Sequence, residues 1–310
     1  MGYLYDGHTV MKILSGKGVS QRVERLKKKS SCPYDGIVFC SRNLPNDSFL
    51  QLIKPARRGG HPVISNKYFH YELRCSLFHL FWLPYCKSEW STHIRINPNK
   101  KRLTPKGVLE ILLLVFGDLD GIHVHSFDEK VDLKNQTVRG IVKKLFVPYV
   151  RSLKDFEYKQ ETYYYGERSG QQTKVYDKGK EQGTKEGELT RVEKRKKYSG
   201  DQRPTLKEFL FSPESKALSS LVLVDVDKID KRKRLGKFIK QHLTIQEAYR
   251  SMDDAMRKQF KRHEGYTNPL IDLGKVFTDD AVAWIRISFS DKNEIEQGLL
   301  DYNSREETAV

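Results

Sequence analysis

Apolar residues recur along the chain at two spacings, every second residue and every third or fourth, and so predict both strands and helices. An apolar run over 34–40 predicts a first strand, and the aromatic-rich stretch 69–85 predicts one or two more. Residues 93–97 alternate and end in the turn signal Asn97-Pro98. A longer strand is expected over 122–133.

The best-defined helix of the chain is expected between these strands. Thr104 is a typical N-cap residue, and Pro105 follows at the first helical position, where its missing N–H costs nothing. Gly117 is expected to end the helix. The apolar residues between them fall on one face, which we expect to be buried: Leu109, Leu112, Leu113 and Phe116.

The middle of the chain predicts one more helix and three short strands. The helix is expected over 135–146 and is ended by Pro148. The strands are expected at 163–165, 173–176 and 189–193, separated by glycine-containing turns. Hairpin-like connections favour antiparallel pairing, so the predicted fold class is α+β, with a mostly antiparallel sheet and helices packed on one face.

Beyond residue 200 the pattern becomes helical and basic. Pro204-Thr205-Leu206 starts a helix, and the segment 228–240 is dense in Lys and Arg. Thr244 and Glu247 have the spacing of a capping box, and they open a helix with one apolar face: Ile245, Tyr249, Met252, Met256 and Phe260. The basic residues between them form either a DNA-binding surface or an ordinary solvated face.

Composition narrows the class of partner. The 310 residues include 56 Lys and Arg against 40 Asp and Glu, a formal charge of +16, and the pI is about 9.5. Such an excess favours a polyanion such as nucleic acid, because basic side chains release counterions from phosphates. The alternative is a basic surface that serves solubility alone. No apolar run approaches the roughly 18–20 residues that span a bilayer, so we expect a cytoplasmic protein without a membrane partner.

Two pairs of potential metal ligands lie in the strand expected over 122–133. His123 and His125 are two residues apart and Asp128 and Asp132 are four apart, so each pair shares a strand face, and the two faces are opposite. One ion cannot bind both pairs unless a bulge intervenes. Aspartate is uncommon in strands, and its oxygens suit Mg²⁺ or Mn²⁺. The histidines are the second candidate pair.

Tyr176 differs from the other tyrosines of this region because charged residues follow it directly. It ends a predicted strand and precedes Asp177 and Lys178. A phenol becomes a useful nucleophile when its anion is stabilised, and Lys178 could do this or hold a phosphate. The alternative is a half-buried tyrosine that only packs in a strand.

Arg191 and Glu193 also share a strand face, because they are two residues apart. Arg191 is a second candidate cation for phosphate chemistry. Glu193 can complete a carboxylate metal site with Asp128, or it can pair with a lysine.

In this order and at this spacing, the motifs resemble those of rolling-circle replication initiators. The greatest similarity is to the gene II proteins of filamentous phages and related plasmid replication initiation factors. The resemblance covers residues 90–195, and the block from Tyr176 to Glu181 is its most specific part. The motifs that carry it are Ile96-Asn97-Pro98-Asn99-Lys100, Val108 to Phe116, Asp128 with Asp132, Tyr164-Tyr165-Gly166, Val175 to Glu181, and Leu189-Thr190-Arg191-Val192-Glu193.

The resemblance implies a catalytic domain like that of the HUH endonucleases. It makes Tyr176 the nucleophile and Asp128 and Glu193 metal ligands, and it relates His123-Val124-His125 to the His-hydrophobic-His motif of the wider endonuclease superfamily. The implied enzyme is a metal-dependent, site-specific single-strand DNA endonuclease and strand transferase. It would form a 5′-phosphotyrosine and a free 3′-OH, with origin DNA, a host helicase and a host polymerase as partners.

Four segments are expected on this basis. They are a basic N-terminal arm at 1–30, a catalytic nicking domain at 31–200, a helical, basic DNA-binding region at 201–295 and an acidic flexible tail at 296–310.

Two alternatives to a replication initiator of a plasmid or phage remain open. A conjugative relaxase would use the same chemistry on a different DNA target. A non-catalytic, basic DNA-binding regulator is favoured by Ser126, because the similar proteins usually have arginine at this position.

Overall fold

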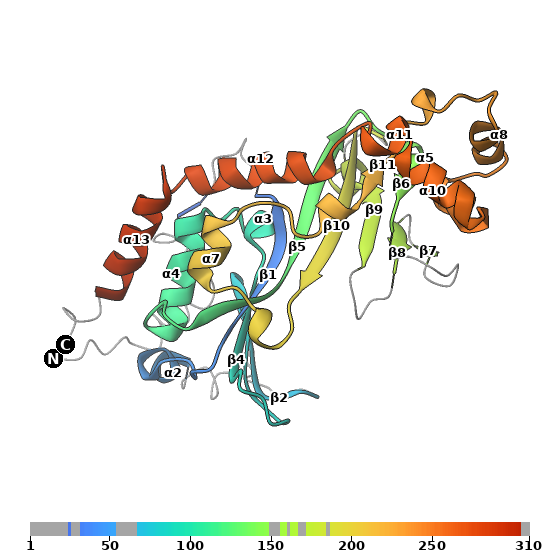
Figure 1. Cartoon of the computed structure of the whole chain (residues 1–310). Helices are drawn as coiled ribbons and strands as arrows, with labels where there is room; N and C mark the ends of the chain where they lie inside the picture. Colours follow the sequence, from blue (N-terminus) through green and yellow to red (C-terminus); the bar gives the residue numbers. More distant parts are fainter. Residues whose placement is uncertain are drawn as a thin grey trace. The chain divides into compact units, whose positions relative to one another are not determined.

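The chain divides into two compact units, each assembled from separate stretches of sequence in the computed structural model. Unit 1 comprises residues 1–127, 197–213 and 280–310, and unit 2 comprises residues 128–196 and 214–279. Figure 1 labels their helices and strands. The residues that the structure describes are 24–25, 32–53, 67–148, 156–159, 162–166, 172–183 and 187–304.

The sheet of unit 1 is antiparallel at each pairing of its first four strands. Strand β2 pairs with β3, β3 with β4, and β4 with β1, and the first part of β5 lies beside β1. The bounds are β1 Tyr34–Ser41, β2 Phe69–Arg74, β3 Phe78–Pro84, β4 Thr92–Ile96 and β5 Ile122–Lys134. The strands expected at 34–40, 93–97 and 122–133 are thus present, and the stretch 69–85 supplies two strands.

The helix expected after Thr104 forms with the predicted caps. Helix α4 spans Pro105–Phe116, the Thr104 side chain accepts a hydrogen bond from the N–H of Gly107, and Gly117 ends the helix with φ +86°. The other helices of unit 1 are α2 Asp47–Ile53, α3 Pro98–Lys101, α7 Leu206–Phe211 and α13 Lys292–Ser304, and α12 Leu273–Arg286 begins in unit 2 and ends in unit 1.

Four aromatic rings from distant parts of the sequence form the centre of the unit 1 core. Tyr34 on β1 contacts Phe127 on β5, Phe209 on α7 and Trp284 on α12, with ring centroids 5.1–5.6 Å apart. The indole N–H of Trp284 donates to the carbonyl of Leu103 at 3.0 Å. Buried aromatic rings of this size dominate core energetics, so this cluster joins the three stretches of unit 1.

The sheet of unit 2 is also antiparallel where its pairings are defined. Strand β10 pairs with β9, β9 with β8, and β8 with β7, and the second part of β5 lies beside β10. The bounds are β7 Phe156–Lys159, β8 Thr162–Tyr165, β9 Thr173–Asp177 and β10 Leu189–Lys197. A small second sheet pairs β6 Leu145–Phe146 with β11 Val222–Leu223. The fold class is therefore α+β, as predicted.

Helical segments cover the apolar face of the unit 2 sheet. Val175 and Val192 lie opposite each other on this face and are fully buried. Helix α5 packs on β9, and α9 packs on β6. The helices of unit 2 are α5 Val138–Lys144, α6 Lys178–Glu181, α8 Arg234–Lys240, α9 Ile245–Ser251, α10 Asp254–Arg262 and α11 Glu264–Thr267.

Three expectations about secondary structure need correction. The helix expected over 135–146 ends at Lys144 because Leu145 and Phe146 pair with β11. Strand β7 was not expected. The helix expected from Thr244 is broken into α9 and α10, since the Asp253 side chain caps a new helix by accepting from the N–H of Met256 at 2.7 Å. Both helices still bury their apolar side chains in one cluster.

The expected segment boundaries also differ from the structure. The division into units does not follow a limit at residue 200, because each unit contains residues from both sides of it. Residues 296–304, expected in a flexible tail, belong to helix α13, where Ile295 is buried. Most of the expected arm at 1–30 lies outside the described residues. Within the part of the chain that the structure describes, no helix is long and apolar enough to cross a membrane.

A buried carboxylate fastens a loop of unit 2 to the sheet. Glu129 on β5 is fully buried and accepts four hydrogen bonds, from the Ser215 hydroxyl and from the N–H groups of Lys216, Ala217 and Leu218, at 2.6–3.1 Å. Burial raises the pKa of Glu129, and the four donors oppose that shift. The carboxylate is the acceptor for backbone donors that would otherwise be unsatisfied.

We expect Glu129→Gln to lower the free energy of unfolding by about 2–4 kcal/mol, because an amide N–H₂ would face backbone donors in a buried place. Urea denaturation of the full chain measures this change. Glu188→Gln is the matched control, since Glu188 is exposed, and should change the midpoint little. An equal effect of the two substitutions would contradict a role for the buried contacts.

Candidate active site

The candidate site lies on the polar face of the unit 2 sheet, where β9 and β10 run side by side. Tyr176 is directly opposite Arg191, and Lys174 is directly opposite Glu193. Because side chains alternate along a strand, these four residues share one face, with the valines on the other. A phenol, a carboxylate and two cations are thereby brought together from residues 174–193.

Tyr176 and Glu193 are in direct contact. The phenol oxygen donates a hydrogen bond to Glu193 Oε1 at 2.5 Å. Glu193 is buried, with 5% of its surface exposed, and Tyr176 is half-buried. Arg191 Nη1 lies 3.7 Å from Glu193 Oε1, and Lys174 Nζ lies 3.7 Å from Glu193 Oε2. The carboxylate can accept the phenol proton, with two cations beside it.

Two ion pairs of the same geometry link β5 to β10 on this face. Arg191 binds both oxygens of Asp132 at 2.5 and 2.8 Å, and Arg195 binds both oxygens of Asp128 at 2.7 and 2.9 Å. The arginines are four residues apart, as are the aspartates, which fits antiparallel neighbours. Glu193 lies between the two arginines along β10.

The ion pairs shift the pKa values of Arg191, Asp132 and Arg195 in the direction that keeps each side chain ionised. Burial would lower the pKa of Arg191, but the hydrogen bonds to Asp132 and the charges of Asp132, Tyr176 and Glu193 raise it overall. Burial would raise the pKa of Asp132, but Arg191 and Lys130 lower it overall. The hydrogen bonds to Asp128 are the main reason that the pKa of Arg195 is raised.

A polar cavity of about 330 Å³ opens beside these residues. Its lining includes two of the three candidate metal-ligating carboxylates, without Asp132, and all of it belongs to unit 2: Asp128, Tyr164, Gln172, Lys174, Glu193 and Arg195. Mg²⁺ commonly binds one or two protein carboxylates and completes its shell with water and substrate phosphate. Asp128 and Glu193 bring two carboxylates to the lining of this cavity. Among the described residues, no group of three or more His, Cys, Asp or Glu side chains forms a metal cage.

Lys178, expected beside the phenol, is engaged elsewhere. Its Nζ pairs with Glu181 Oε2 at 2.8 Å within helix α6. Asp177 caps that helix by accepting from the N–H of Lys180, and its other oxygen accepts from the N–H of Gly187. Asp177 therefore holds the turn after β9, while Lys174 and Arg191 are the cations nearest to Glu193.

His123 and His125 make their contacts in unit 1. His123 Nδ1 lies 3.1 Å from the carbonyl of Arg203, and the Arg203 guanidinium lies 3.3 Å from His125 Nδ1. The rings of His125 and His93 are 5.3 Å apart. Burial and the nearby Arg203 charge lower the pKa of His125 to about 4, and burial, His125 and Arg203 lower that of His93 to about 4. The Arg203 guanidinium therefore lies beside His125, which was expected to be a metal ligand.

Sequence reasoning missed Lys174, Arg195 and Tyr164 as parts of the site. The first two had a signal, because Lys174 precedes Tyr176 by two residues and Arg195 follows Glu193 by two, so each shares a face with its neighbour. Tyr164 is brought in by the pairing of β8 with β9, where it lies opposite Lys174. Antiparallel pairing of these strands was expected, but the register that sets Tyr164 opposite Lys174 was not.

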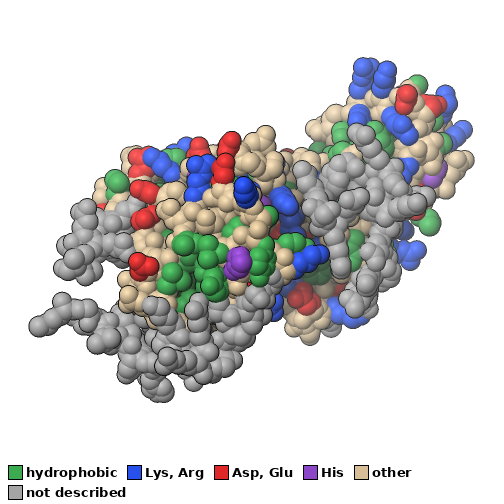
Figure 2. Space-filling model, turned by 90° about the horizontal axis from the view of Figure 1, so that it is seen from below, with side chains coloured by type: hydrophobic (Ala, Val, Ile, Leu, Met, Phe, Trp, Pro, Cys, Tyr) green, Lys and Arg blue, Asp and Glu red, His purple; other side chains and the backbone are tan. Residues whose placement is uncertain are grey.

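Basic side chains also gather on α8 and α10 of unit 2. Figure 2 shows Lys and Arg side chains over the part of the chain where these helices lie. An open groove of about 520 Å³ between α8 and the start of α10 is lined by Arg234, Lys237, Phe238, Gln241, Ser251, Asp253 and Met256. The exposed basic residues on and just before these helices are Lys231, Arg232, Lys233, Arg234, Lys237, Lys240, Lys258, Lys261 and Arg262.

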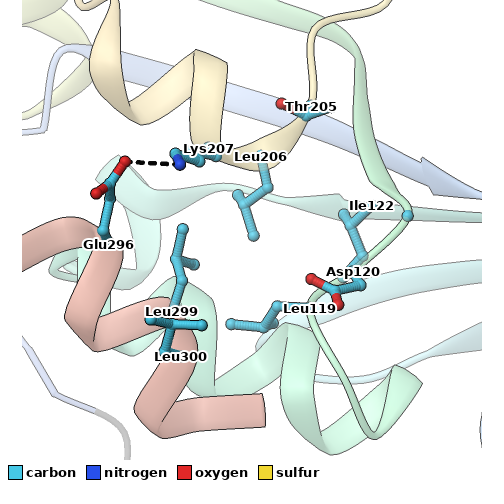
Figure 3. Close-up of a pocket in the computed structure, with 10 residues that line it drawn as sticks. Leu119, Asp120, Ile122, Thr205, Leu206, Lys207, Glu296, Leu299 and Leu300 are labelled. Atoms are coloured by element: carbon cyan, nitrogen blue, oxygen red, sulfur yellow. Dashed lines mark ion pairs between the residues drawn. The ribbon is translucent and has the colours of Figure 1, made fainter.

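A second cavity, of about 390 Å³, lies in unit 1 and has a different character. Figure 3 shows Leu119, Ile122, Leu206, Leu299 and Leu300 around it, with Lys207 and Glu296 forming an ion pair of 2.6 Å at its edge. Its lining contains none of the residues of the tyrosine, aspartate or arginine-glutamate motifs.

The chain was compared with protein-family models, curated proteins and solved structures. No protein-family model matches the chain, and no curated protein matches it. Among solved structures, the chain is similar to one described as a rolling circle replication initiator protein from Geobacillus stearothermophilus, with 11% sequence identity and a TM-score of 0.41, over 81% of this chain and 96% of that chain. A likeness of this size transfers neither fold nor activity.

His93 and His125 give the stability of the chain a predicted pH dependence. Both pKa values are about 4 in the folded chain against an ordinary 6.5, so between these pH values the unfolded chain binds more protons. The free energy of unfolding should therefore fall as the pH drops from about 6.5 to 4. Urea denaturation across this range measures the slope, which His93→Gln and His125→Gln should each reduce. An unchanged slope in both variants would assign the dependence to other groups.

Proposed function

We propose that this protein initiates rolling-circle DNA replication by nicking one strand of an origin through Tyr176. The observation that carries the proposal is the 2.5 Å hydrogen bond from the Tyr176 phenol to the buried Glu193 carboxylate. Arg191 and Lys174 lie beside that carboxylate, and a polar cavity opens next to it. A nucleophile held by a base, with cations nearby, is the arrangement that transesterification requires.

In the proposed reaction, Glu193 accepts the phenol proton as the Tyr176 oxygen attacks a DNA phosphorus. The bond from phosphorus to the tyrosine oxygen forms, and the bond to the 3′ oxygen breaks. The 3′ oxygen takes up the proton that Glu193 received. The products are a 5′-phosphotyrosine and a free 3′-OH that a host polymerase can extend. One phosphodiester replaces another, so the strand can be rejoined without ATP.

The cations of the site have separate tasks in this proposal. Lys174 and Arg191, which lie beside Glu193, offset the negative charge that grows on the phenol and on the phosphate. Asp132 fixes the direction of the Arg191 guanidinium through both of its oxygens, so Asp132 is a positioning residue. Lys178, at the start of α6, remains a candidate for holding the phosphate of the DNA strand.

Asp128 and Glu193 would hold a Mg²⁺ or Mn²⁺ ion at the cavity. The ion would polarise a non-bridging phosphate oxygen and stabilise the transition-state charge. The histidine pair is the weaker candidate, because Arg203 places a positive charge beside His125. The basic helices α8 and α10 would bind origin DNA through its phosphates, and a host helicase would open the duplex.

We expect Tyr176→Phe to abolish covalent attachment to DNA while origin binding is retained, because only the hydroxyl is lost. Incubation with Mg²⁺ or Mn²⁺ and a labelled single-stranded origin oligonucleotide, followed by denaturing electrophoresis and mass spectrometry of the adduct peptide, measures attachment. Tyr163→Phe on β8 is the matched control and should form the adduct normally. An adduct in the Tyr176→Phe variant would refute the assignment, and a wild-type protein that binds DNA without forming an adduct would be a regulator.

Glu193→Gln should lower the rate of nicking by roughly 10²- to 10⁴-fold, because the amide cannot accept the phenol proton. Binding of the oligonucleotide without a divalent cation, measured by fluorescence anisotropy, should stay close to that of the wild type. Glu188→Gln, just before the same strand, is the control for the loss of one negative charge. A nicking rate close to the wild-type rate would exclude Glu193 as the base.

A further inference from the structure

The two ion pairs between β5 and β10 differ in their access to solvent. The Arg191 side chain, bound to Asp132, is only 2% exposed. The Arg195 side chain, bound to Asp128, is 36% exposed, and Asp128 itself is 12% exposed. Arg191 is thus held by the protein interior, whereas Arg195 has room to leave its partner.

Arg195 shares a cavity with the carboxylate that it binds. Asp128, Glu193 and Arg195 all line the space of about 330 Å³. The guanidinium contacts Asp128 Oδ1 at 2.7 Å and Asp128 Oδ2 at 2.9 Å. Because the guanidinium occupies a site on each oxygen and places a positive charge beside them, it competes with a divalent cation that would bind Asp128 from the cavity.

We propose that Arg195 is an exchangeable counter-ion that controls access of a divalent cation to Asp128. Without DNA, the guanidinium covers the carboxylate. When a phosphodiester enters the cavity, Arg195 turns to it, because phosphate oxygens match the same two-pronged donor geometry as a carboxylate. Asp128 is then open to the cation. The part played by DNA rests on the proposed nicking function.

Exchange of this kind makes the two ligands depend on each other. The phosphodiester tightens cation binding by removing a competitor, and by linkage the cation tightens phosphodiester binding by the same factor. A rise of about tenfold lies within the usual range of such couplings. The ion would thus be recruited mainly when a DNA strand is in place. Arg195 binds the phosphodiester in this scheme and takes no part in the bond changes.

Binding of Mn²⁺ to the full chain, followed by the electron paramagnetic resonance signal of the free ion, tests the exchange without any need for cleavage. In the wild type, a short oligothymidylate should tighten Mn²⁺ binding about tenfold after subtraction of binding to the oligonucleotide alone. Arg195→Gln should bind Mn²⁺ about tenfold more tightly than the wild type without DNA, and the oligonucleotide should add little.

Three further variants separate this exchange from a general effect of charge or a loss of fold. Lys197→Gln removes a positive charge from an exposed residue at the end of the same strand and should leave Mn²⁺ binding unchanged. Arg195→Lys keeps the charge but loses the two-pronged contact, so its affinity should be intermediate. Asp128→Asn should remove the tight binding in the Arg195→Gln background.

The proposal is overturned if Arg195→Gln binds Mn²⁺ no more tightly than the wild type, or if neither protein binds Mn²⁺. It is also overturned if the oligonucleotide still tightens Mn²⁺ binding about tenfold in the Arg195→Gln variant. The two proposals can fail separately. If the Mn²⁺ affinities change as expected but Tyr176→Phe still forms the covalent adduct, the exchange at Arg195 is supported and nicking through Tyr176 is refuted.

Discussion

The antiparallel register of β9 and β10 is the constraint on which the candidate site depends. It sets Tyr176 opposite Arg191 and Lys174 opposite Glu193. A slip of β9 by one residue would turn Tyr176 and Lys174 to the opposite face, away from Arg191 and Glu193. The register is maintained from the opposite side, where Val175 and Val192 are paired and fully buried. Burial of apolar surface on one face thus fixes the chemistry on the other.

The polar face of the unit 2 sheet places charged side chains where they are partly buried, and burial of charge costs free energy. Glu193 is nearly buried, and a buried carboxylate requires donors and cations around it. The Tyr176 hydroxyl, Arg191 and Lys174 meet that requirement, although buried ion pairs often contribute little net stability. In the proposed function, the same charges act on a DNA phosphate. Arg195, which lines the cavity, is more exposed than Arg191, the other ion-paired arginine.

Local patterns predicted local features well and distant contacts poorly. The caps of α4 at Thr104 and Gly117 were predicted because capping depends on residues within one helical turn. The break between α9 and α10 at Asp253 was missed because the apolar spacing continues across it and both helices pack in one cluster. Lys178 was expected beside the phenol from its closeness in sequence, yet it pairs with Glu181. The roles of the site residues stay predictions.

The sequence by itself determined that Tyr176 and Lys174 lie on one face of their strand, and that Arg191 and Glu193 lie on one face of theirs. The reason is that side chains alternate between the two faces of an extended chain. It also determined the excess of positive charge. Only the tertiary structure decided which strands are neighbours, and so which charge meets which: Arg191 with Asp132, Arg195 with Asp128, and Glu193 with Tyr176. The physical reason is that these pairs join residues 17 to 67 positions apart, and such pairing is settled by burial of the whole sheet.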